Sequence, residues 1–276
     1  MKKILILGGG FGGVATYKRL HKLVHPANIH DLKIELINRT NYFTFSPMLH
    51  EVATGSVERE HIVQPLREII GCCGKDFHQA NVIKVDPKKK LVYTDMGNHS
   101  YDVLVLALGV EQSYFNTPGA KEHALALKWL PGAIAIRNRI INSFEQASDM
   151  HDKKEPKAMN KYLNFVIVGG GATGTELAGQ ISDLVHNEMS KYYGDISKNH
   201  ANIILVHAGE RLLEQLSPGA SKAAYKKLKS MDVQILLKNT VTEVTKDSVK
   251  LSSNISIPSN SVFWTAGTES HLKGIL

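Results

Sequence analysis

Apolar residues follow the same order twice along the chain. An apolar run at Ile4–Leu7 leads directly into a stretch of glycines, and apolar residues then recur at helical spacing over Val14–Val24. The same order returns at Phe165–Val168 and Leu177–Val185. A strand that enters a turn and then a helix is typical of α/β folds with parallel sheets. The pattern therefore predicts a strand–glycine turn–helix unit that occurs twice.

Further apolar segments extend each unit. A second strand is expected at Lys33–Arg39 in the first unit and at Asn202–His207 in the second. Between the units, turn residues separate three shorter strand patterns, at Asn81–Asp86, Lys90–Thr94 and Tyr101–Leu108. Together these elements predict an α/β protein with two Rossmann-like domains.

Both glycine turns have the spacing G-x-G-x-x-G, which indicates dinucleotide binding when a strand precedes it and a helix follows. The first glycine allows the sharp turn, the second lets a pyrophosphate approach the backbone, and the third lets the helix pack closely on the strand. The amino end of the helix offers free N–H groups to the phosphates. One such motif is compatible with a turn that binds nothing, whereas two motifs one domain apart favour nucleotide binding. The glycines are Gly8, Gly10 and Gly13 in the first turn and Gly169, Gly171 and Gly174 in the second.

The ends of the second strands are where ribose hydroxyls are usually bound by Asp or Glu. The first unit has Asn38 there, followed by Arg39, and the second has His207, with Arg211 four residues later. Asparagine can bind a hydroxyl without supplying charge. Histidine neither favours a ribose hydroxyl nor repels a 2′-phosphate strongly, so NADH and NADPH both stay open at this point.

Glu176 follows the last glycine of the second motif by two residues. An acid in the first turns of a helix is favoured by the helix dipole alone. A carboxylate at this place could also orient a nicotinamide cofactor or relay a proton, and the sequence leaves the two interpretations even.

The segment between the two motifs divides the chain. A helix is predicted over Ala133–Ala147, and the polar, lysine-rich segment His151–Asn164 is interpreted as a linker. We therefore predict a first domain over residues 1–118, a connecting helix and linker over 119–160, and a second domain over 161–276.

The composition restricts the class of protein. Of the 276 residues 43% are hydrophobic and 21% charged, and no apolar run is long enough to span a bilayer. The apolar start is too short for a signal peptide and leads into glycines, so we expect a cytoplasmic protein. The net charge of +7 is compatible with a solvated surface or with attraction to anionic lipid, and no motif supports nucleic-acid binding.

The cysteines and the paired histidines are not spaced for redox chemistry or for metal binding. Cys72 and Cys73 are adjacent, which disfavours a disulfide between them, so packing roles are expected. His21 and His25 share a helix face at i,i+4 spacing, but no third ligand is evident. No metal site is predicted.

Several segments resemble type II NADH:quinone oxidoreductases, the single-subunit, non-pumping NADH dehydrogenases. The resemblance extends over essentially the whole chain and is strongest in Asn41–Gly55, Tyr101–Gly109, Arg137–Glu145, Val168–Gly179 and Val262–Gly267. It implies a flavoprotein of the two-dinucleotide type, built from three-layer ββα sandwiches. FAD would bind residues 1–118 and the nicotinamide cofactor residues 161–276, with NADH favoured and NADPH as the alternative.

The resemblance also implies a reaction and a site. NADH would give a hydride to the flavin, which would reduce a quinone, and Glu176 would lie near the meeting point as the catalytic residue. The enzyme would be peripheral on the cytosolic face of a membrane, and a homodimer is one expected assembly. The implied cofactor-binding residues besides the six motif glycines are Phe11, Gly12, Asn38, Arg39, Pro47, Thr54, Val82, Ala107, Leu108, Gly109, Thr173, His207, Ala266 and Gly267.

The sequence departs from this family at its end. Family members continue with a Gly-Asp segment that contacts FAD and with amphipathic helices that bind the membrane. This sequence ends at Leu276, before both. We therefore expect a fragment or a shortened protein. In family members the Gly-Asp segment supports FAD binding and the amphipathic helices support contact with an anionic membrane, so both properties are expected to be weakened in this chain.

Two other functions stay open. Another NAD(P)H-dependent flavoprotein reductase of the same architecture, such as a sulfide:quinone or ferredoxin reductase, would have the same glycine turns. Adjacent cysteines do not suit sulfide oxidation, which needs separated reactive thiols. A non-catalytic nucleotide-binding module would keep the turns without turnover, and retained flavin colour would distinguish it.

Overall fold

The chain forms two compact units, each with one of the glycine turns. The structure, a computed structural model, describes residues 1–24, 31–71, 76–153, 156–272 and 274–275. Unit 1 consists of Met1–Phe45, Glu60–Glu111 and Thr268–Leu276, and unit 2 of Ser46–Arg59 and Gln112–Gly267.

Neither unit is one continuous stretch of sequence, which differs from the predicted boundaries at 118 and 160. Ser46–Arg59 belongs to unit 2 because its helix α2 (Leu49–Thr54) packs against α5 (Leu130–Asp152) and α7 (Ala172–Asp183). The last residues return to unit 1, where Ile275 packs into an apolar cluster.

A parallel sheet forms the centre of unit 1, in the order β5-β2-β1-β9. Parallel strands are covered on both faces, and this explains why the first strand is a continuous apolar run. The strands are β1 (Lys2–Leu7), β2 (Leu32–Asn38), β5 (Phe77–Gln79) and β9 (Val103–Leu106).

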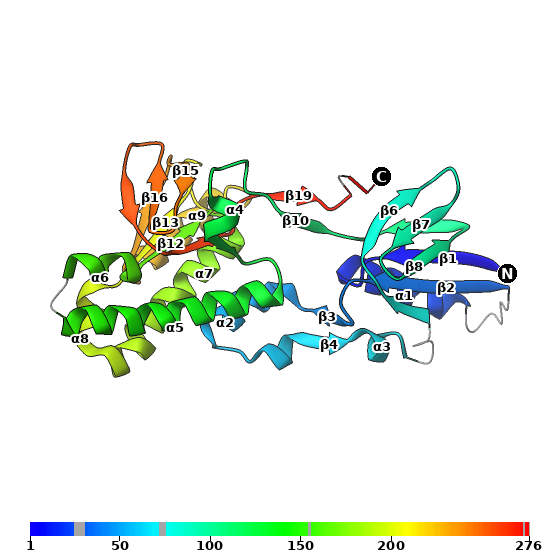
Figure 1. Ribbon diagram of the computed structural model, residues 1–276, viewed down its shortest axis with the longest axis horizontal. Coiled ribbons are helices and arrows are strands. Elements are labelled where there is room, and N and C mark those ends of the chain that lie inside the picture. Colours follow the sequence, from blue (N-terminus) through cyan, green and yellow to red (C-terminus); the bar gives the residue numbers. More distant parts are fainter. Residues whose placement is uncertain (25–30, 72–75, 154–155, 273, 276) are drawn as a thin grey trace. The chain divides into compact units, whose positions relative to one another are not determined.

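In unit 1 the sheet lies between α1 (Phe11–Val24) and an antiparallel meander (Figure 1), and alternate side chains of the sheet pack against these two layers. Ile6 and Leu36 face α1, whose Tyr17 is buried with them. Leu5 and Ile37 face the other way, towards an antiparallel meander. The meander consists of β6 (Val82–Asp86), β7 (Leu91–Thr94) and β8 (Gly97–Ser100), of which β8 was expected only as a turn.

One charged group is buried among these layers. The Glu35 carboxylate lies 2.5 Å from the Lys3 ammonium and 2.7 Å from the Lys33 ammonium, and its side chain is 4% exposed. Burial alone would raise the pKa of Glu35, but the hydrogen bonds from the two ammonium groups outweigh it and hold the pKa below the usual value.

Unit 2 repeats the layers around a parallel sheet in the order β11-β18-β12-β13-β14. Phe165 and Phe263 stack on the side of helix α5, next to its Phe144. Val166 and Val262 face a second antiparallel meander. The strands are β11 (Ala124–Ala126), β18 (Ser261–Trp264), β12 (Asn164–Val168), β13 (Asn202–Val206) and β14 (Val233–Leu236), and the meander is β15 (Val241–Val244), β16 (Ser248–Leu251) and β17 (Ser256–Pro258).

The ββα layering of both units confirms the predicted fold class. The remaining elements are β3 (Tyr42–Thr44), η1 (Ser46–Met48), η2 (Arg59–Ile62), β4 (Val63–Pro65), α3 (Leu66–Ile69), β10 (Val110–Gln112), α4 (Ala120–His123), α6 (Pro156–Leu163), η4 (Leu184–Met189), α8 (Ser190–His200), α9 (Pro218–Ser230) and β19 (Thr268–Ser270). None of the helices in the described part of the chain is long and apolar enough to cross a membrane.

The segment His151–Asn164, predicted as a linker, is instead largely helical. Helix α5 continues to Asp152, and α6 follows and packs against it. Met159 and Leu163 are buried, so two apolar residues in a polar segment are enough to fix a short helix on its neighbour. Cys72, Cys73 and His25 lie outside the described residues.

Candidate dinucleotide-binding sites

The glycine turn of unit 1 leaves space at one position and none at two others. Gly8 has φ +106°, and a Cβ there would overlap the Ala107 carbonyl oxygen. A Cβ at Gly13 would overlap the Gly8 carbonyl oxygen. At Gly10, however, no atom of the described residues lies within 4 Å of the Cβ position. The turn is therefore tightly packed on its inner side and open where a pyrophosphate would approach.

The predicted residues around this turn lie at the carboxyl ends of β1, β2 and β9. Asn38 Oδ1 accepts a hydrogen bond of 2.8 Å from the Gly9 N–H, and its Nδ2 donates to the carbonyl and hydroxyl of Thr40. Ala107 N donates to the Leu7 carbonyl. Asn38 thus braces the glycine turn, a role that the sequence did not predict beside ribose binding.

The other predicted residues of unit 1 frame the same end of the sheet. Phe11 and Gly12 are exposed in the first turn of α1, and the Phe11 ring packs edge-on against Phe43 and Phe45. Leu108 packs on the apolar cluster beneath the meander. Gly109 has φ +75°, a backbone conformation that favours glycine.

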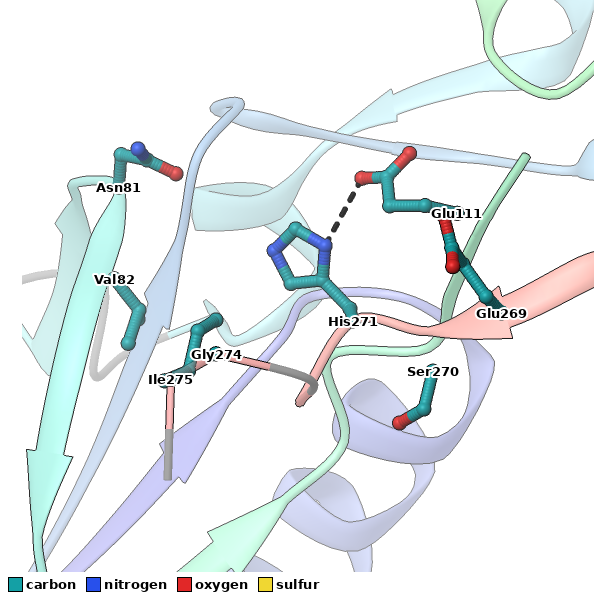
Figure 2. A pocket seen from close by; sticks show the side chains of 8 residues that line it. All are labelled: Asn81, Val82, Glu111, Glu269, Ser270, His271, Gly274 and Ile275. Atoms are coloured by element: carbon teal, nitrogen blue, oxygen red, sulfur yellow. Dashed lines mark ion pairs between the residues drawn. The ribbon is translucent and has the colours of Figure 1, made fainter. Parts of the chain in front are cut away.

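An open pocket of about 560 Å³ adjoins this region (Figure 2). Its Glu111 accepts from Arg39 Nη1 at 3.0 Å and lies 3.1 Å from His271 Nδ1. Two residues predicted from the sequence thus lie at this pocket. Val82 lines it, and Arg39 is paired with Glu111 in its wall. The lining residues are Asn81, Val82, Glu111, Glu269, Ser270, His271, Gly274 and Ile275.

The glycine turn of unit 2 repeats the first. Gly169 has φ +114°, and a Cβ at Gly174 would overlap the Gly169 carbonyl oxygen. At Gly171 the described residues again leave 4 Å of free space around the Cβ position, and Thr173 is exposed beside it. Neither α1 nor α7 has an acidic residue in its first turn. Two open glycines at uncharged helix starts fit two pyrophosphate groups.

His207 occupies the place in unit 2 that Asn38 occupies in unit 1. Its imidazole packs against Gly170, where a Cβ would lie 2.7 Å from the ring. Its Nε2 is buried and has no hydrogen-bond partner among the described residues. A Cβ at Gly209 would overlap Glu214 Oε1 and lie 2.7 Å from His207 Nε2, so a carboxylate flanks the same glycine as the imidazole. The sequence did not single out Glu214.

Arg211, a candidate partner for a 2′-phosphate, is held by its own loop. Its guanidinium donates to the carbonyls of Leu213 at 3.3 Å, Glu214 at 2.6 Å and Leu216 at 3.1 Å. These bonds fix the loop that presents the Glu214 side chain.

Glu176 lies on α7 opposite α2. Its Oε2 is 3.5 Å from His50 Nδ1, and His50 Nε2 is 3.9 Å from Glu51 Oε1. Farther along α7, Gln180 Oε1 accepts from the Ser56 hydroxyl at 2.9 Å and from the predicted Thr54 at 3.4 Å. His50 is a candidate that the sequence did not reveal, because only the packing of α2 on α7 brings it to Glu176. Pro47, in η1, also belongs to unit 2.

The last predicted residues follow β18. Gln112 Nε2 donates to the carbonyls of Ala266 at 2.6 Å and Gly267 at 2.8 Å, and Trp264 Nε1 donates to Ala266 at 2.8 Å. Thr265 donates to the Val168 carbonyl and fills the space beside Gly174. The backbone at this strand end is therefore fixed next to the glycine turn.

Known proteins are similar to this chain over nearly its whole length. A family model described as pyridine nucleotide-disulphide oxidoreductase matches residues 2–275. The chain is 30% identical over 281 residues to the type II NADH:quinone oxidoreductase Ndh of Mycobacterium tuberculosis, covering 99% of this chain and 58% of that protein. It is 30% identical over 282 residues to the mitochondrial external alternative NAD(P)H-ubiquinone oxidoreductase B4 of Arabidopsis thaliana, covering 96% of this chain and 47% of that protein. The chain thus spans about half the length of these relatives.

Solved structures agree on the fold. NDH2 from Plasmodium falciparum in complex with NADH matches with a TM-score of 0.87 at 23% identity, over 100% of this chain and 57% of that one. The sulfide:quinone oxidoreductase of Aquifex aeolicus matches with a TM-score of 0.74 at 19% identity, over 100% and 60%. The resemblance to type II NADH:quinone oxidoreductases is confirmed at the level of sequence. The match over residues 2–275, together with two glycine turns in two ββα units, shows that this chain belongs to the pyridine nucleotide-disulphide oxidoreductase family.

Proposed function

We propose that the chain is the nucleotide-binding core of a type II NADH:quinone oxidoreductase, with FAD in unit 1, NADH in unit 2 and a quinone as electron acceptor. The observation that supports this most is the pair of open glycines, Gly10 and Gly171, within otherwise closely packed turns. Relatives at 30% identity are named for NADH or NAD(P)H and for a quinone.

In unit 1 the proposed FAD site follows the carboxyl ends of the parallel strands. The N–H groups at the start of α1 would bind the pyrophosphate beside Gly10, while Arg39 and Glu111 would hold the polar groups of the adenosine half near Val82. When bound, FAD supplies the two-electron chemistry that joins a nicotinamide donor to a quinone acceptor.

In unit 2 the proposed cofactor is NADH, with NADPH disfavoured. The unpartnered His207 Nε2 and the Glu214 carboxylate can both accept hydrogen bonds from ribose hydroxyls. A 2′-phosphate at that place would meet the negative charge of Glu214, and the nearby Arg211 is committed to backbone carbonyls. Glu214 would thus supply the acid that the end of β13 lacks.

Glu176 is the proposed catalytic residue, and His50 is its proposed partner. Glu176 is half exposed, so its carboxylate is accessible to a ligand at the start of α7. The imidazole of His50 can exchange a proton with Glu176 Oε2 through Nδ1 and can receive one at Nε2 beside Glu51. The pair would hold or deliver the protons that quinone reduction consumes.

The proposal also covers location and assembly. The protein would be either cytoplasmic or bound peripherally to the cytosolic face of a membrane, and it would assemble as a homodimer. The net charge of +7 favours contact with anionic lipid. Co-sedimentation with vesicles with and without anionic lipid would test the membrane contact, and light scattering would test the dimer.

The visible absorption spectrum of the purified chain, before and after anaerobic NADH, tests the central proposal. We expect flavin bands, intrinsic or after reconstitution with FAD, that bleach on addition of NADH and recover with a soluble quinone. A Glu176→Gln variant should keep the bands and lose quinone-dependent turnover.

Other outcomes would support the alternatives. A protein that binds NADH but never FAD would be a nucleotide-binding module. Bleaching by NADH with recovery by a protein acceptor such as a ferredoxin, and not by quinone, would indicate another flavoprotein reductase.

A further inference from the structure

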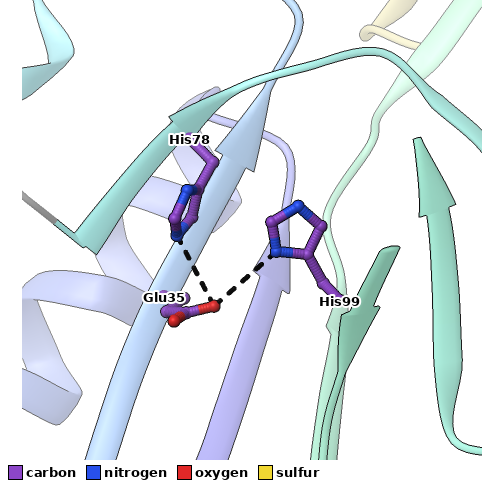
Figure 3. A group of neighbouring side chains, drawn as sticks. All are labelled: Glu35, His78 and His99. Atoms are coloured by element: carbon purple, nitrogen blue, oxygen red, sulfur yellow. Dashed lines mark ion pairs between the residues drawn. The ribbon is translucent and has the colours of Figure 1, made fainter. Parts of the chain in front are cut away.

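We propose that Glu35, His78 and His99 of unit 1 form a binding site for one divalent transition-metal ion, with zinc as the expected ion (Figure 3). The three residues come from three strands, β2, β5 and β8, and both imidazole rings point to the same carboxylate oxygen. His78 Nε2 lies 3.6 Å from Glu35 Oε2, and His99 Nδ1 lies 3.9 Å from it.

These separations fit a zinc ion. Zinc is bound tetrahedrally at about 2.0–2.1 Å by His nitrogen and carboxylate oxygen, so its ligand atoms stand about 3.3 Å from one another. All three ligand atoms lie within 4.8 Å of one another, and shifts of less than about 1 Å would close the site. Two histidines and one carboxylate would leave the fourth position to water.

The site has a ligand atom that the protein leaves unused. His78 Nε2 is buried and has no hydrogen-bond partner among the described residues, which is an unfavourable state for a polar atom. The second oxygen of Glu35 stays bonded to Lys33, and this bond would orient the carboxylate towards the ion.

Lys3 is the competitor for the ion. Its ammonium lies 2.5 Å from Glu35 Oε2, the oxygen that faces the two histidines. Its side chain is 23% exposed, so it can turn to solvent when an ion takes its place. Metal affinity should therefore increase when the charge of Lys3 is removed, which is the opposite of what loss of a structural contact would produce.

Unit 2 shows that the fold itself does not require these polar residues. In β1 and β2, Leu5 pairs with Glu35, and in the equivalent register of unit 2 Val166 pairs with Ile204. His78 pairs with Ile37, and in unit 2 Leu236 pairs with Val206. The positions of Glu35 and His78 in unit 1 are therefore occupied by the apolar residues Ile204 and Leu236 in unit 2.

The test is a zinc titration of the chelator-treated full chain near neutral pH. Calorimetry measures the binding of the ion, and the thermal unfolding midpoint is measured with and without zinc. We expect one ion per chain, a higher midpoint with zinc, and visible bands of tetrahedral Co²⁺ when cobalt replaces zinc. His78→Gln and His99→Gln should each weaken binding at least tenfold and abolish the zinc-dependent rise of the midpoint. Lys3→Met should tighten binding several-fold.

Matched controls are His123→Gln and His151→Gln, two exposed histidines of unit 2. Each titration is repeated with Cys72→Ser and Cys73→Ser, because thiolates are strong zinc ligands. Binding that survives both His78→Gln and His99→Gln, that is lost with the cysteines, or that falls equally in the controls would overturn the proposal. So would weaker binding in a folded Lys3→Met variant. None of these readouts depends on FAD, NADH or quinone.

Discussion

The two glycine turns have the same backbone and different chemistry at the neighbouring strand end. In unit 1 Asn38 bonds to the Gly9 N–H and is satisfied within the chain, whereas in unit 2 His207 packs against Gly170 with its Nε2 unpartnered. Both turns have glycines at the same positions, whereas the adjacent side chain supports the turn by a hydrogen bond in unit 1 and by packing in unit 2. The comparison shows that the fold forms the same glycine turn twice, while each strand end presents a different polar group beside it.

The largest effect is expected from filling the packed glycines. Gly13→Ala and Gly174→Ala each place a methyl group on a backbone carbonyl that cannot move without shifting a strand. We expect each to destabilise its unit by about 3 kcal/mol, measured by denaturant unfolding.

Gly10→Ala and Gly171→Ala are the matched controls, because their Cβ positions are open. They should unfold like the parent protein, yet Gly10→Ala should lose FAD and Gly171→Ala should lose NADH affinity. If a folded Gly10→Ala protein kept FAD as well as the parent did, the proposed pyrophosphate contact would be wrong.

The buried charge of unit 1 provides the next test. Glu35→Gln should lower the free energy of unfolding by about 2 kcal/mol, because it removes the charged partner of Lys3 and Lys33. The double variant Glu35→Ile and His78→Leu places the apolar residue types of unit 2 at these two positions. It should restore part of that loss, because it leaves no buried polar group there and the partly exposed Lys3 and Lys33 can turn to solvent. A double variant less stable than Glu35→Gln would show that the two units tolerate different cores.

The strand end of unit 2 should set nucleotide preference. Glu214→Gln should reduce the preference for NADH over NADPH about tenfold, since a hydrogen bond to a charged group contributes about 1.5–3 kcal/mol. Dissociation constants from fluorescence titration would measure it. Glu210→Gln is the control, because Glu210 is exposed and paired with Lys238. An equal change in both variants would indicate a general charge effect.

The smallest effect concerns pH. Burial and the charges of His78 and Lys3 lower the pKa of His99 below its usual 6.5. The unfolded chain therefore binds a proton first as the pH falls below 6.5, and the neutral folded form loses stability there by at most about 1.4 kcal/mol per pH unit. His99→Gln should flatten the dependence of the unfolding midpoint on pH in that range. An unchanged slope would contradict this assignment.

Local patterns predicted the strands β1, β2, β6, β7, β9, β12 and β13 and both glycine turns, since strand periodicity and glycine spacing are properties of neighbouring residues. Most of the shorter strands were not predicted. Helix α6 was missed because its two buried residues, Met159 and Leu163, are isolated in a polar segment, and only the packing of α6 against α5 shows that they belong to a helix. Strand β8 was missed because Gly97 and Asn98 suggest a turn, and only pairing with β7 extends them. Both errors arise where packing outweighs local preference.

The candidate sites show the same division. The glycines and His207 could be chosen from motif spacing, and Glu176 from its place after the second motif together with the family resemblance. His50 and Glu214 could not, because they reach Glu176 and His207 only through the packing of α2 on α7 and the folding of the loop after β13. The Glu35 cluster likewise joins strands that the sequence separates widely.

The sequence by itself determined two dinucleotide-binding units, because short-range spacing fixes where a strand, a sharp turn and a helix start follow one another. The tertiary structure decided which polar side chains meet: the acid beside His207, the histidine beside Glu176 and the two histidines beside Glu35. Such meetings depend on sheet order and on the return of distant segments, which follow from burying apolar surface across the whole chain.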